Sequence, residues 1–387
     1  MSVTVGTGIS VEADPLAGAT EAAALAAAGL DGQPADLALV FASGAHLAAP
    51  EATLEGIHAT LAPAMLVGCG AGGVLGSGRE LESGTAIAVW TASLGEGQAH
   101  PFHAQVTGDE DDATLEGLAE PAGGGAVIML SDPYSFPTDA VLAGLAGAAP
   151  GIPVLGGLSS ARTLEGGGAL FLDSTVHEDG AVGVSLEGVE MLPCVSQGAA
   201  PLGREVTITA AEGNVIYELA GRPAIETIEQ VIGELGVRER ALVAAGLLLG
   251  IVIDSGKPEY EQGDFLVRGV LGADPDNGAV AIGASVETGQ VVRLHARDAR
   301  SADEDLRREL RVRAAAIGDQ PPAGALVFSC NGRGQSMFGA CDHDATLLED
   351  ELGGAPAAGF FAAGEIGPVG GRSFLHGFTA TVAVFPG

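Results

Sequence analysis

The chain contains little lysine and few aromatic residues. Lys257 is the only lysine in 387 residues, and 17 Lys and Arg stand against 50 Asp and Glu, giving a net charge of −33. A surface this negative argues against nucleic acid and anionic membranes as partners, because phosphate contacts need Lys and Arg. Aromatic residues make up only 4% of the chain while glycine reaches 61. Small and branched aliphatic residues must therefore build the core, with many tight turns.

Paired cysteines and long apolar runs are also missing. Cys69, Cys194, Cys330 and Cys341 form no C-x-x-C pair, so reduced thiols are expected. The N-terminus has no basic segment followed by an apolar one, and no uninterrupted apolar run is long enough to span a bilayer. We therefore predict a cytoplasmic protein that has no signal peptide and does not insert into a membrane.

One pattern occurs three times along the chain. Each copy consists of an apolar strand, a polar loop, an amphipathic helix, a second apolar strand, a glycine-rich loop and a third strand. Corresponding positions of the first and second strands are Ala38 and Gly68, Ala126 and Gly156, and Ala325 and Gly359. The loops differ most between copies, and loops on a rigid framework usually carry the binding groups.

This pattern predicts an α/β fold with some α+β character. Two tandem domains of strand-helix-strand-strand units are expected, with mixed sheets flanked by helices. The segment "EGVEMLPCVSQGAAPLG" loses all periodicity and contains Pro193 and Pro201, which favours a boundary there. The predicted domains are residues 1–190 and residues 191–387.

Three helices are predicted from their sequences. The Ala-rich segment 15–30 has no β-branched run, and "PAIETIEQVIGEL" begins with Pro223 in the first turn. In "SADEDLRRELRVRAAAI", Ser301 is the expected N-cap and Glu304 would complete a capping box. The turn signals "AEGN" and "PDNG" predict two tight hairpins in the second half.

The motif "GCGAGG" matches a dinucleotide fingerprint only in part. Gly68, Gly70 and Gly73 have the G-x-G-x-x-G spacing, but the fingerprint also requires a helix to open at once and an acidic residue about 20 positions later. Here a turn-rich segment, "VLGSGRELESG", leads into another strand. We therefore predict no nucleotide site and no cofactor.

The loop "CNGRG" after the strand "ALVFS" is a stronger signal. Its glycines let backbone N–H groups converge on an anion, and Arg333 adds a planar fork for a carboxylate. The loop "FFAAGEIGPVGGRSFLHG" would supply Glu365 and His376 if the two preceding strands are neighbours. An ion pair of Arg333 with a nearby acid explains the same residues without a ligand. The candidate ligand-binding residues are Cys330, Asn331, Gly332, Arg333, Gly334, Gly364, Glu365 and His376.

Other chemistry has weaker support. A thiol nucleophile is possible if Cys330 lies near His343 or His376. Soft metal ligation could involve Cys330, Cys341 and His343, although their spacing matches no known zinc site. No catalytic and no metal residue is assigned. His295 shares one face of its strand with the arginine two residues later, and a polar ladder within the sheet is the simpler interpretation.

The chain resembles the FIST family (F-box and intracellular signal transduction proteins) nearly end to end. The motifs "GTGIS", "ADLALVFAS", "MLVGCGAGGVLGSG" and "PVLGGLSS" followed by "HEDGAVGVSLEG" are similar to the FIST N domain. "PLGREVTITAAEGNVIYELAGRPAIETI", "ALVFSCNGRG", "GFFAAGEIGP" and "LHGFTATVAVF" are similar to the FIST C domain. The resemblance implies a sensory module that binds small ligands such as amino acids, with no enzymatic activity attached to the fold.

The resemblance and the residues point to the same positions. The family's typical C-terminal positions correspond to Cys330, Asn331, Arg333, Gly334, Gly364, Glu365 and His376. We predict a stand-alone sensor that binds an amino acid or another small carboxylate in its C-terminal domain. A separate output protein is expected, since no kinase, cyclase, receptor or F-box segment accompanies the two domains. Two alternatives stay open: a thiol-dependent enzyme that uses Cys330, and a protein-interaction scaffold without a small ligand. The oligomeric state, a homo-oligomer included, is also open.

Overall fold

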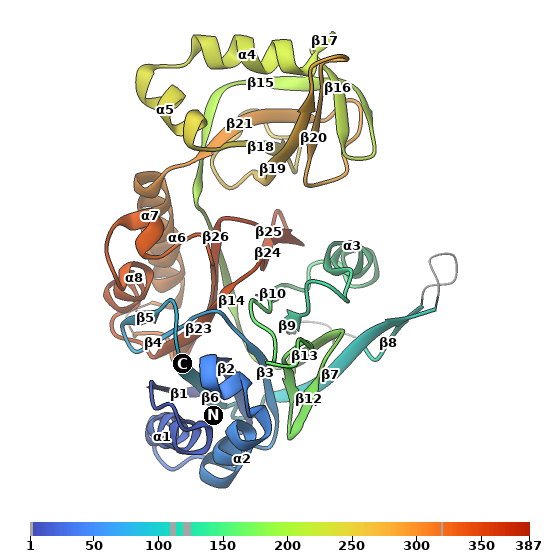
Figure 1. Cartoon of the computed structure of the whole chain (residues 1–387). Coiled ribbons are helices and arrows are strands. Elements are labelled where there is room, and N and C mark those ends of the chain that lie inside the picture. Colours follow the sequence, from blue (N-terminus) through green and yellow to red (C-terminus); the bar gives the residue numbers. More distant parts are fainter. Residues whose placement is uncertain (1–2, 109–113, 119–124, 319) are drawn as a thin grey trace. The chain divides into compact units, whose positions relative to one another are not determined.

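A computed structural model describes residues 3–108, 114–118, 125–318 and 320–387 (Figure 1). It confirms an α/β fold with mixed sheets flanked by helices. The first compact unit comprises Met1–Val195, Leu306–Leu375 and Ala380–Gly387, and the second comprises Ser196–Asp305 and His376–Thr379. The first unit thus takes residues from both sides of position 190, and the division into sequence domains there stays a prediction. No helix in the described ranges is long and apolar enough to cross a membrane.

The first unit contains three sheets. The first has the order β1 (Thr4–Ser10), β6 (Ala86–Ser93), β2 (Leu37–Ser43), β3 (Leu66–Gly70), β11 (Leu170–Leu172), β12 (Thr175–His177). The second has the order β25 (Arg372–His376), β24 (Glu365–Val369), β10 (Val154–Leu158), β9 (Ala126–Ser131), β13 (Ala181–Glu187), β7 (Gln98–Thr107), β8 (Thr114–Glu116). The third has the order β14 (Leu192–Gln197), β26 (Thr379–Phe385), β22 (Gly324–Cys330), β23 (Ala357–Ala362), β4 (Val74–Gly76), β5 (Arg79–Leu81).

These sheets share one plan. In each, a central strand pairs in parallel with the next strand on one side and antiparallel with a later strand on the other. A hairpin from elsewhere in the chain then extends the sheet beyond the parallel pair: β11–β12 beside β3, β24–β25 beside β10, and β4–β5 beside β23. Each hairpin follows the parallel pair of one sheet along the chain but joins a different sheet. The hairpin after the first sheet's pair joins the third sheet, the one after the second's joins the first, and the one after the third's joins the second; we call this the hairpin exchange.

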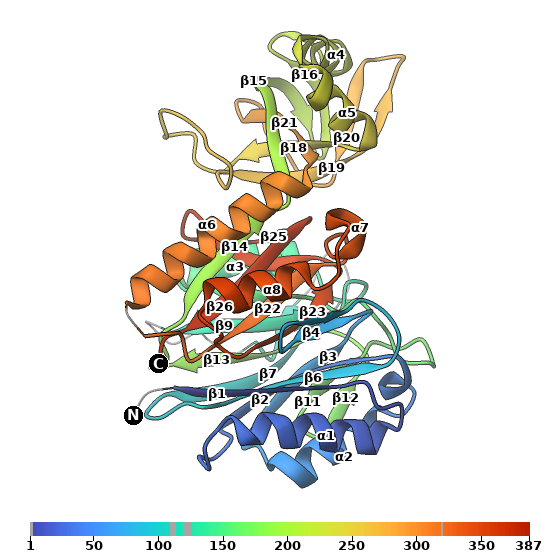
Figure 2. The same ribbon diagram turned by 90° about the vertical axis from the view of Figure 1, so that its left-hand side faces the viewer.

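The inner faces of the three sheets share one apolar core. Its aromatic side chains include Trp90, Phe41 and Phe360, and the last two stack with ring centroids 5.0 Å apart. Helices cover the outer faces (Figures 1 and 2): α1 (Pro15–Ala28) and α2 (Pro50–Leu61) the first sheet, α3 (Thr138–Ala148) the second, α6 (Ala299–Ile317) and α8 (His343–Glu351) the third. Burial on both faces explains why the central strands are continuous apolar runs.

A glycine occupies the same place in each parallel pair. Gly68, Gly156 and Gly359 each lie opposite a carbonyl of the neighbouring strand. A Cβ at these positions would lie 2.2, 1.8 and 1.8 Å from that carbonyl oxygen. No side chain fits there, so the close approach of the strands requires glycine.

Helix boundaries follow local signals in one case and tertiary contacts in another. Asp14 caps α1, accepting a hydrogen bond from the Ala17 N–H at 2.9 Å. The predicted N-cap Ser301 is wrong, because α6 begins at Ala299. The Ser301 hydroxyl donates instead to Gln262 Oε1 at 3.0 Å, so a partner distant in sequence takes the group that a capping box would use.

The second unit contains a closed sheet. Its order is β15 (Ala199–Glu212), β21 (Val291–Arg297), β18 (Leu247–Val252), β19 (Phe265–Asp274), β20 (Ala279–Ile282), β16 (Val215–Leu219), β17 (Arg222–Pro223), and β15 also pairs with β16. The two predicted hairpins join β15 to β16 and β19 to β20. The helix α4 (Ala224–Glu234) packs its apolar side on this sheet, and α5 (Val237–Ala245) follows it.

Candidate functional site

The loop after β22 turns sharply at the end of a buried strand. The Asn331 N–H donates to the last carbonyl of β23 at 2.9 Å, and the Arg333 N–H donates back to the Cys330 carbonyl at 2.8 Å. Gly334 has a φ of 75°, and a Cβ there would lie 2.6 Å from the carboxyl carbon of Glu82. Both the positive φ and the close carboxylate require glycine.

Arg333 is buried and forms an ion pair with Asp344 of α8. Its side chain is 0% exposed, and Nε and Nη2 donate to Asp344 Oδ2 and Oδ1 at 2.6 and 2.9 Å. The Ser329 hydroxyl donates to Asp344 Oδ2 at 3.1 Å, and His343 Nδ1 lies 3.0 Å from Oδ1. Burial alone would raise the pKa of Asp344, but the charge of Arg333 and the contact with His343 hold it well below its usual range.

The third nitrogen of the guanidinium has a different environment. Nη1 of Arg333 makes no hydrogen bond to any residue that the structure describes. Burial lowers the pKa of Arg333, but Asp344, then Cys330 and Glu365, interact with the charge and raise it above its ordinary value. We call Cys330, Arg333, Asp344, Glu365 and Glu80 the Arg333 cluster.

Glu365 reaches this cluster through the exchanged hairpin β24–β25. It is 0% exposed and pairs with Gly157 of β10. Next to it, the Gly364 carbonyl accepts from the Leu158 N–H at 2.8 Å. The sequence singled out two loops, one after β22 and one after β23. Both therefore lie in the same unit, because β22 and β23 are parallel neighbours and the chain crosses from β23 to β24.

An aromatic stack closes one side of the guanidinium. The short helix α7 (Gln335–Phe338) places the Phe338 ring 5.1 Å from Arg333 Cζ. His343 stacks on the same ring, with centroids 3.5 Å apart and an interplanar angle of 5°. The ring contributes a cation–π contact and shields the ion pair from water.

Two glutamates near the cluster were not predicted from the sequence. Glu80 lies on β5, and Glu82 directly follows this strand. Glu80 Oε1 accepts from the Ala345 N–H at 3.0 Å and Glu82 Oε1 from the Gln335 N–H at 2.7 Å. Burial, and next the charge of Asp344, raise the pKa of Glu80 to about 7. Its Oε2 makes no hydrogen bond within the described ranges. No local signal could have found these residues, because strand pairing alone brings the hairpin to β23.

The remaining candidates lie in different places. The Gly332 N–H donates to Cys330 Sγ at 3.4 Å, beside Asn331 in the loop. His376 ends β25, is buried and belongs to the second compact unit, whereas the other candidates belong to the first. A ligand-binding role for any of them stays a prediction at this point.

Metal binding finds no support in the described part of the chain, where no three His, Cys, Asp or Glu side chains gather as ligands. Cys341 is exposed. In the second unit, His295 is buried, which lowers its pKa to about 4, and its Nδ1 lies 3.1 Å from the Arg293 carbonyl oxygen. A neutral imidazole packed against Phe265 fits a structural role in the sheet.

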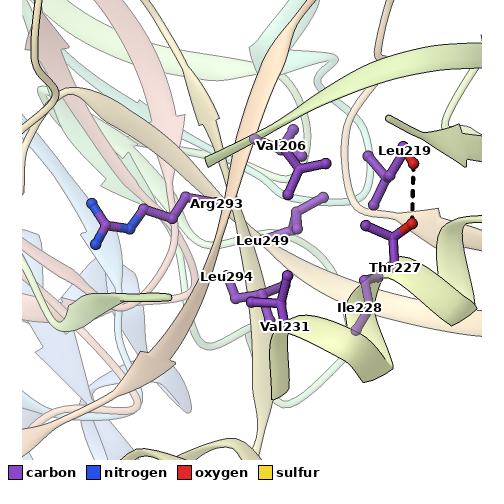
Figure 3. Close-up of a pocket in the computed structure, with 9 residues that line it drawn as sticks. Val206, Leu219, Thr227, Ile228, Val231, Leu249, Arg293 and Leu294 are labelled. Atoms are coloured by element: carbon purple, nitrogen blue, oxygen red, sulfur yellow. Dashed lines mark hydrogen bonds between the residues drawn. The ribbon is translucent and has the colours of Figure 1, made fainter. Parts of the chain in front are cut away.

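A cavity in the second unit is too small for a metabolite. It lies between the sheet and α4 and has a volume of about 10 Å³, room for about one water molecule. Figure 3 shows apolar side chains gathered around it, with Thr227 donating to the Leu219 carbonyl at 3.0 Å. Arg293 points away from the cavity, and its Nη1 lies 3.0 Å from Glu205 Oε1.

A larger cavity lies beside the first sheet. The elements that line it correspond to those that carry the Arg333 cluster beside the third sheet. The volume of this cavity is about 290 Å³. The residues that line it come from the loop after β2 and the start of α2, from the loop after β10, and from β12 and the residue after it: Leu47, Ala48, Pro50, Glu51, Thr163, Leu164, Glu165, Val176 and Glu178. Its three glutamates are exposed, in contrast to the buried acids around Arg333.

Comparison with known proteins agrees with this architecture. Residues 36–222 match the FIST N domain, and residues 224–368 match the FIST C domain. The chain is 43% identical to an uncharacterized protein of Mycobacterium tuberculosis in an alignment of 390 positions that covers 98% of this chain and 99% of that protein. It is 40% identical to an uncharacterized protein of Mycobacterium bovis in an alignment of 388 positions that covers 98% of each chain.

Proposed function

We start from the fact that this chain belongs to the FIST family, whose domains are sensory domains of signal transduction, and propose that it binds a small carboxylate in the Arg333 cluster. An amino acid fits this class, because the cluster combines a guanidinium with buried carboxyl groups. The sensory role follows from the family. The ligand class and the site are proposals from the geometry.

One observation carries the proposal. Nη1 of Arg333 is buried and makes no hydrogen bond to the described residues, although Nε and Nη2 of the same group are both used. A buried donor without an acceptor costs about 1–3 kcal/mol. A ligand carboxylate bound at Nη1 would supply the missing acceptor through a charge-assisted hydrogen bond.

The neighbouring groups suit the rest of an amino acid. Glu365 carries a buried carboxyl group that interacts with the charge of Arg333, and a ligand ammonium would be attracted to it. The backbone of Asn331, Gly332 and Gly334 forms the loop beside Arg333, and Gly364 precedes Glu365. His376 is left out of this site, because it belongs to the second compact unit.

The output would pass to a separate signalling protein. The loop that holds Arg333 is anchored by the exchanged hairpin, since Glu82 accepts from the Gln335 N–H. A ligand that changes the position of this loop would change the surface around α7. A cytoplasmic protein that recognises this surface would then read the state of the sensor.

A thermal-shift screen with the twenty amino acids and small dicarboxylates tests the binding proposal. A ligand that binds only the folded protein, at about a hundred times its Kd, adds about 2.7 kcal/mol of stability. We expect a selective rise of the melting midpoint in the wild type and its loss in Arg333→Lys, which keeps the charge beside Asp344 but removes Nη1. Arg308→Lys is the control, because Arg308 is exposed and should leave the shift unchanged.

Two results would contradict the proposal. An equal shift in wild type and in folded Arg333→Lys would place the ligand elsewhere, and Glu51→Gln would then test the cavity of the first sheet. A flat screen of intact protein would favour the interaction scaffold, and chromatography with a partner search would follow.

A further inference from the structure

The four cysteines of the chain have different surroundings. None is in a disulfide. Cys69 lies in the apolar core, where burial raises the pKa of its thiol far above the usual range. Cys194 is buried in the apolar cluster on the outer face of the third sheet, and Cys341 is exposed. Cys330 is buried at the end of β22, with 9% of the residue exposed.

The sulfur of Cys330 has a backbone hydrogen-bond donor beside it. The Gly332 N–H donates to Sγ at 3.4 Å, a bond that strengthens when the sulfur is a thiolate. The charge of Arg333 interacts with Cys330. A thiol beside a guanidinium and a backbone N–H has the surroundings of reactive cysteines.

Arg333, whose charge interacts with Cys330, also has a nitrogen that makes no hydrogen bond to the described residues. The side chain is fully buried, Asp344 occupies Nε and Nη2, and Nη1 makes no hydrogen bond among the described residues. Sulfur is a weak hydrogen-bond acceptor. An oxygen added to Cys330 Sγ would be a much better one, so the oxidised form supplies the acceptor that the reduced form lacks.

We propose that Cys330 is a site of reversible oxidation by hydrogen peroxide, and that Arg333 Nη1 and the Gly332 N–H hold the resulting sulfenic acid. This proposal does not rest on the binding of a carboxylate. It assigns a modification to one thiol of the chain, and Arg333 acts as a positioning residue for it. Placed beside the loop that carries α7, the added oxygen would change the same surface that a ligand would change.

The reaction balances with peroxide as the named oxidant. The Cys330 thiolate attacks one oxygen of hydrogen peroxide, a sulfur–oxygen bond forms and the oxygen–oxygen bond breaks. The attacked oxygen keeps its proton, giving Cys–SOH, and hydroxide leaves and takes a proton from solvent to become water. Sulfur loses two electrons and the peroxide gains them. A small thiol reverses the step by forming a mixed disulfide, which a second thiol reduces.

Peptide-resolved mass spectrometry of the wild-type chain tests this. The protein is treated with peroxide in the presence of dimedone, a cyclic diketone that traps sulfenic acids, and the adduct is measured at each cysteine. We expect Cys330 to be trapped several times faster than the more exposed Cys341, with no adduct at Cys69. In Arg333→Lys we expect slower trapping at Cys330 and an unchanged rate at Cys341.

The comparison of cysteines within the wild type needs no variant to fold. Trapping of Cys341 as fast as Cys330 would overturn the proposal, because exposure alone would then govern reactivity. So would the absence of adduct at Cys330 in the folded protein when the same peptide is labelled in urea. Folded Arg333→Lys with unchanged trapping at Cys330 would remove Arg333 from the mechanism and contradict the assignment of Nη1.

Discussion

The third and first sheets differ at corresponding positions, between the exchanged hairpin and the covering helix. In the third, Arg333, Phe338 and their partners lie between the exchanged hairpin and the covering helix. In the first, the corresponding space is a cavity of about 290 Å³ with exposed glutamates at its rim. The framework is the same, so the loops decide whether the space is filled by a buried polar cluster or opens to solvent.

This difference shows how one framework can carry both structure and chemistry. A buried ion pair depends on both of its charges, because an uncompensated charge is costly in a low-dielectric interior. Exposed glutamates have no such need, since water solvates them. The Arg333 cluster should therefore be sensitive to single substitutions, and the cavity should tolerate them.

The largest expected effect is the loss of the Arg333 counter-ion. Asp344→Ala leaves a buried guanidinium uncompensated, and we expect a loss of about 3–5 kcal/mol in the free energy of unfolding. Glu178→Ala at the cavity of the first sheet is the matched change and should stay within about 0.5 kcal/mol. Urea denaturation of both variants measures this difference. Similar values for the two would show that the comparison between the sheets has no energetic basis.

A smaller effect should appear in the pH dependence of stability. The pKa of Glu80 rises from its ordinary 4.5 to about 7 in the folded protein. Between these values the folded chain holds more protons than the unfolded one, so the stability from this residue is present at low pH and falls as the pH rises. A shift of this size corresponds to about 3 kcal/mol as an upper estimate.

Glu80→Gln removes this titration while keeping the shape of the side chain. Relative to the variant, the wild type should lose stability between pH 4.5 and 7, as measured by urea unfolding across that range. A constant difference between the two proteins at all pH values would show that Glu80 does not take up a proton on folding.

The smallest expected effect concerns the glycine that each of the three sheets has in its parallel strand pair. Gly359→Ala would place a Cβ 1.8 Å from a carbonyl oxygen of β22, and overpacking of this kind costs about 1–3 kcal/mol. Gly68→Ala should cost a similar amount in the first sheet. Gly144→Ala in α3 is the control, because nothing lies within 4 Å of its Cβ position. It should stabilise the chain by about 0.5–1 kcal/mol through helix propensity. Calorimetry that finds Gly359→Ala harmless would refute the requirement for glycine.

Local sequence signals predicted much of the fold. Apolar runs such as 37–43 and 324–330 gave the buried strands, the Ala-rich segment 15–30 gave α1, and "PDNG" marked a hairpin. Ser301 was wrong as an N-cap because α6 begins at Ala299, and its hydroxyl bonds Gln262, which is distant in sequence. Local signals identify an element well, but they cannot show which distant group competes for its ends.

The candidate site was predictable only in part, for the same reason. The glycines and Arg333 stand out in "CNGRG", and Glu365 stands out in the loop after β23. Asp344 sits in an ordinary amphipathic helix, and Glu80 in a short polar hairpin, so neither carries a signal of its own. Their roles depend on pairing between strands far apart in the chain.

Sequence alone determined the composition of the core, the net negative charge, the family and the order of strands and helices, because each follows from local pattern and composition. The tertiary structure decided that hairpins are exchanged between sheets, which brings Glu80 and Glu365 to Arg333. It also decided that Asp344 takes two nitrogens of Arg333 and leaves Nη1 without a hydrogen bond to the described residues. These contacts arise from strand pairing and burial across hundreds of residues, which no local pattern encodes.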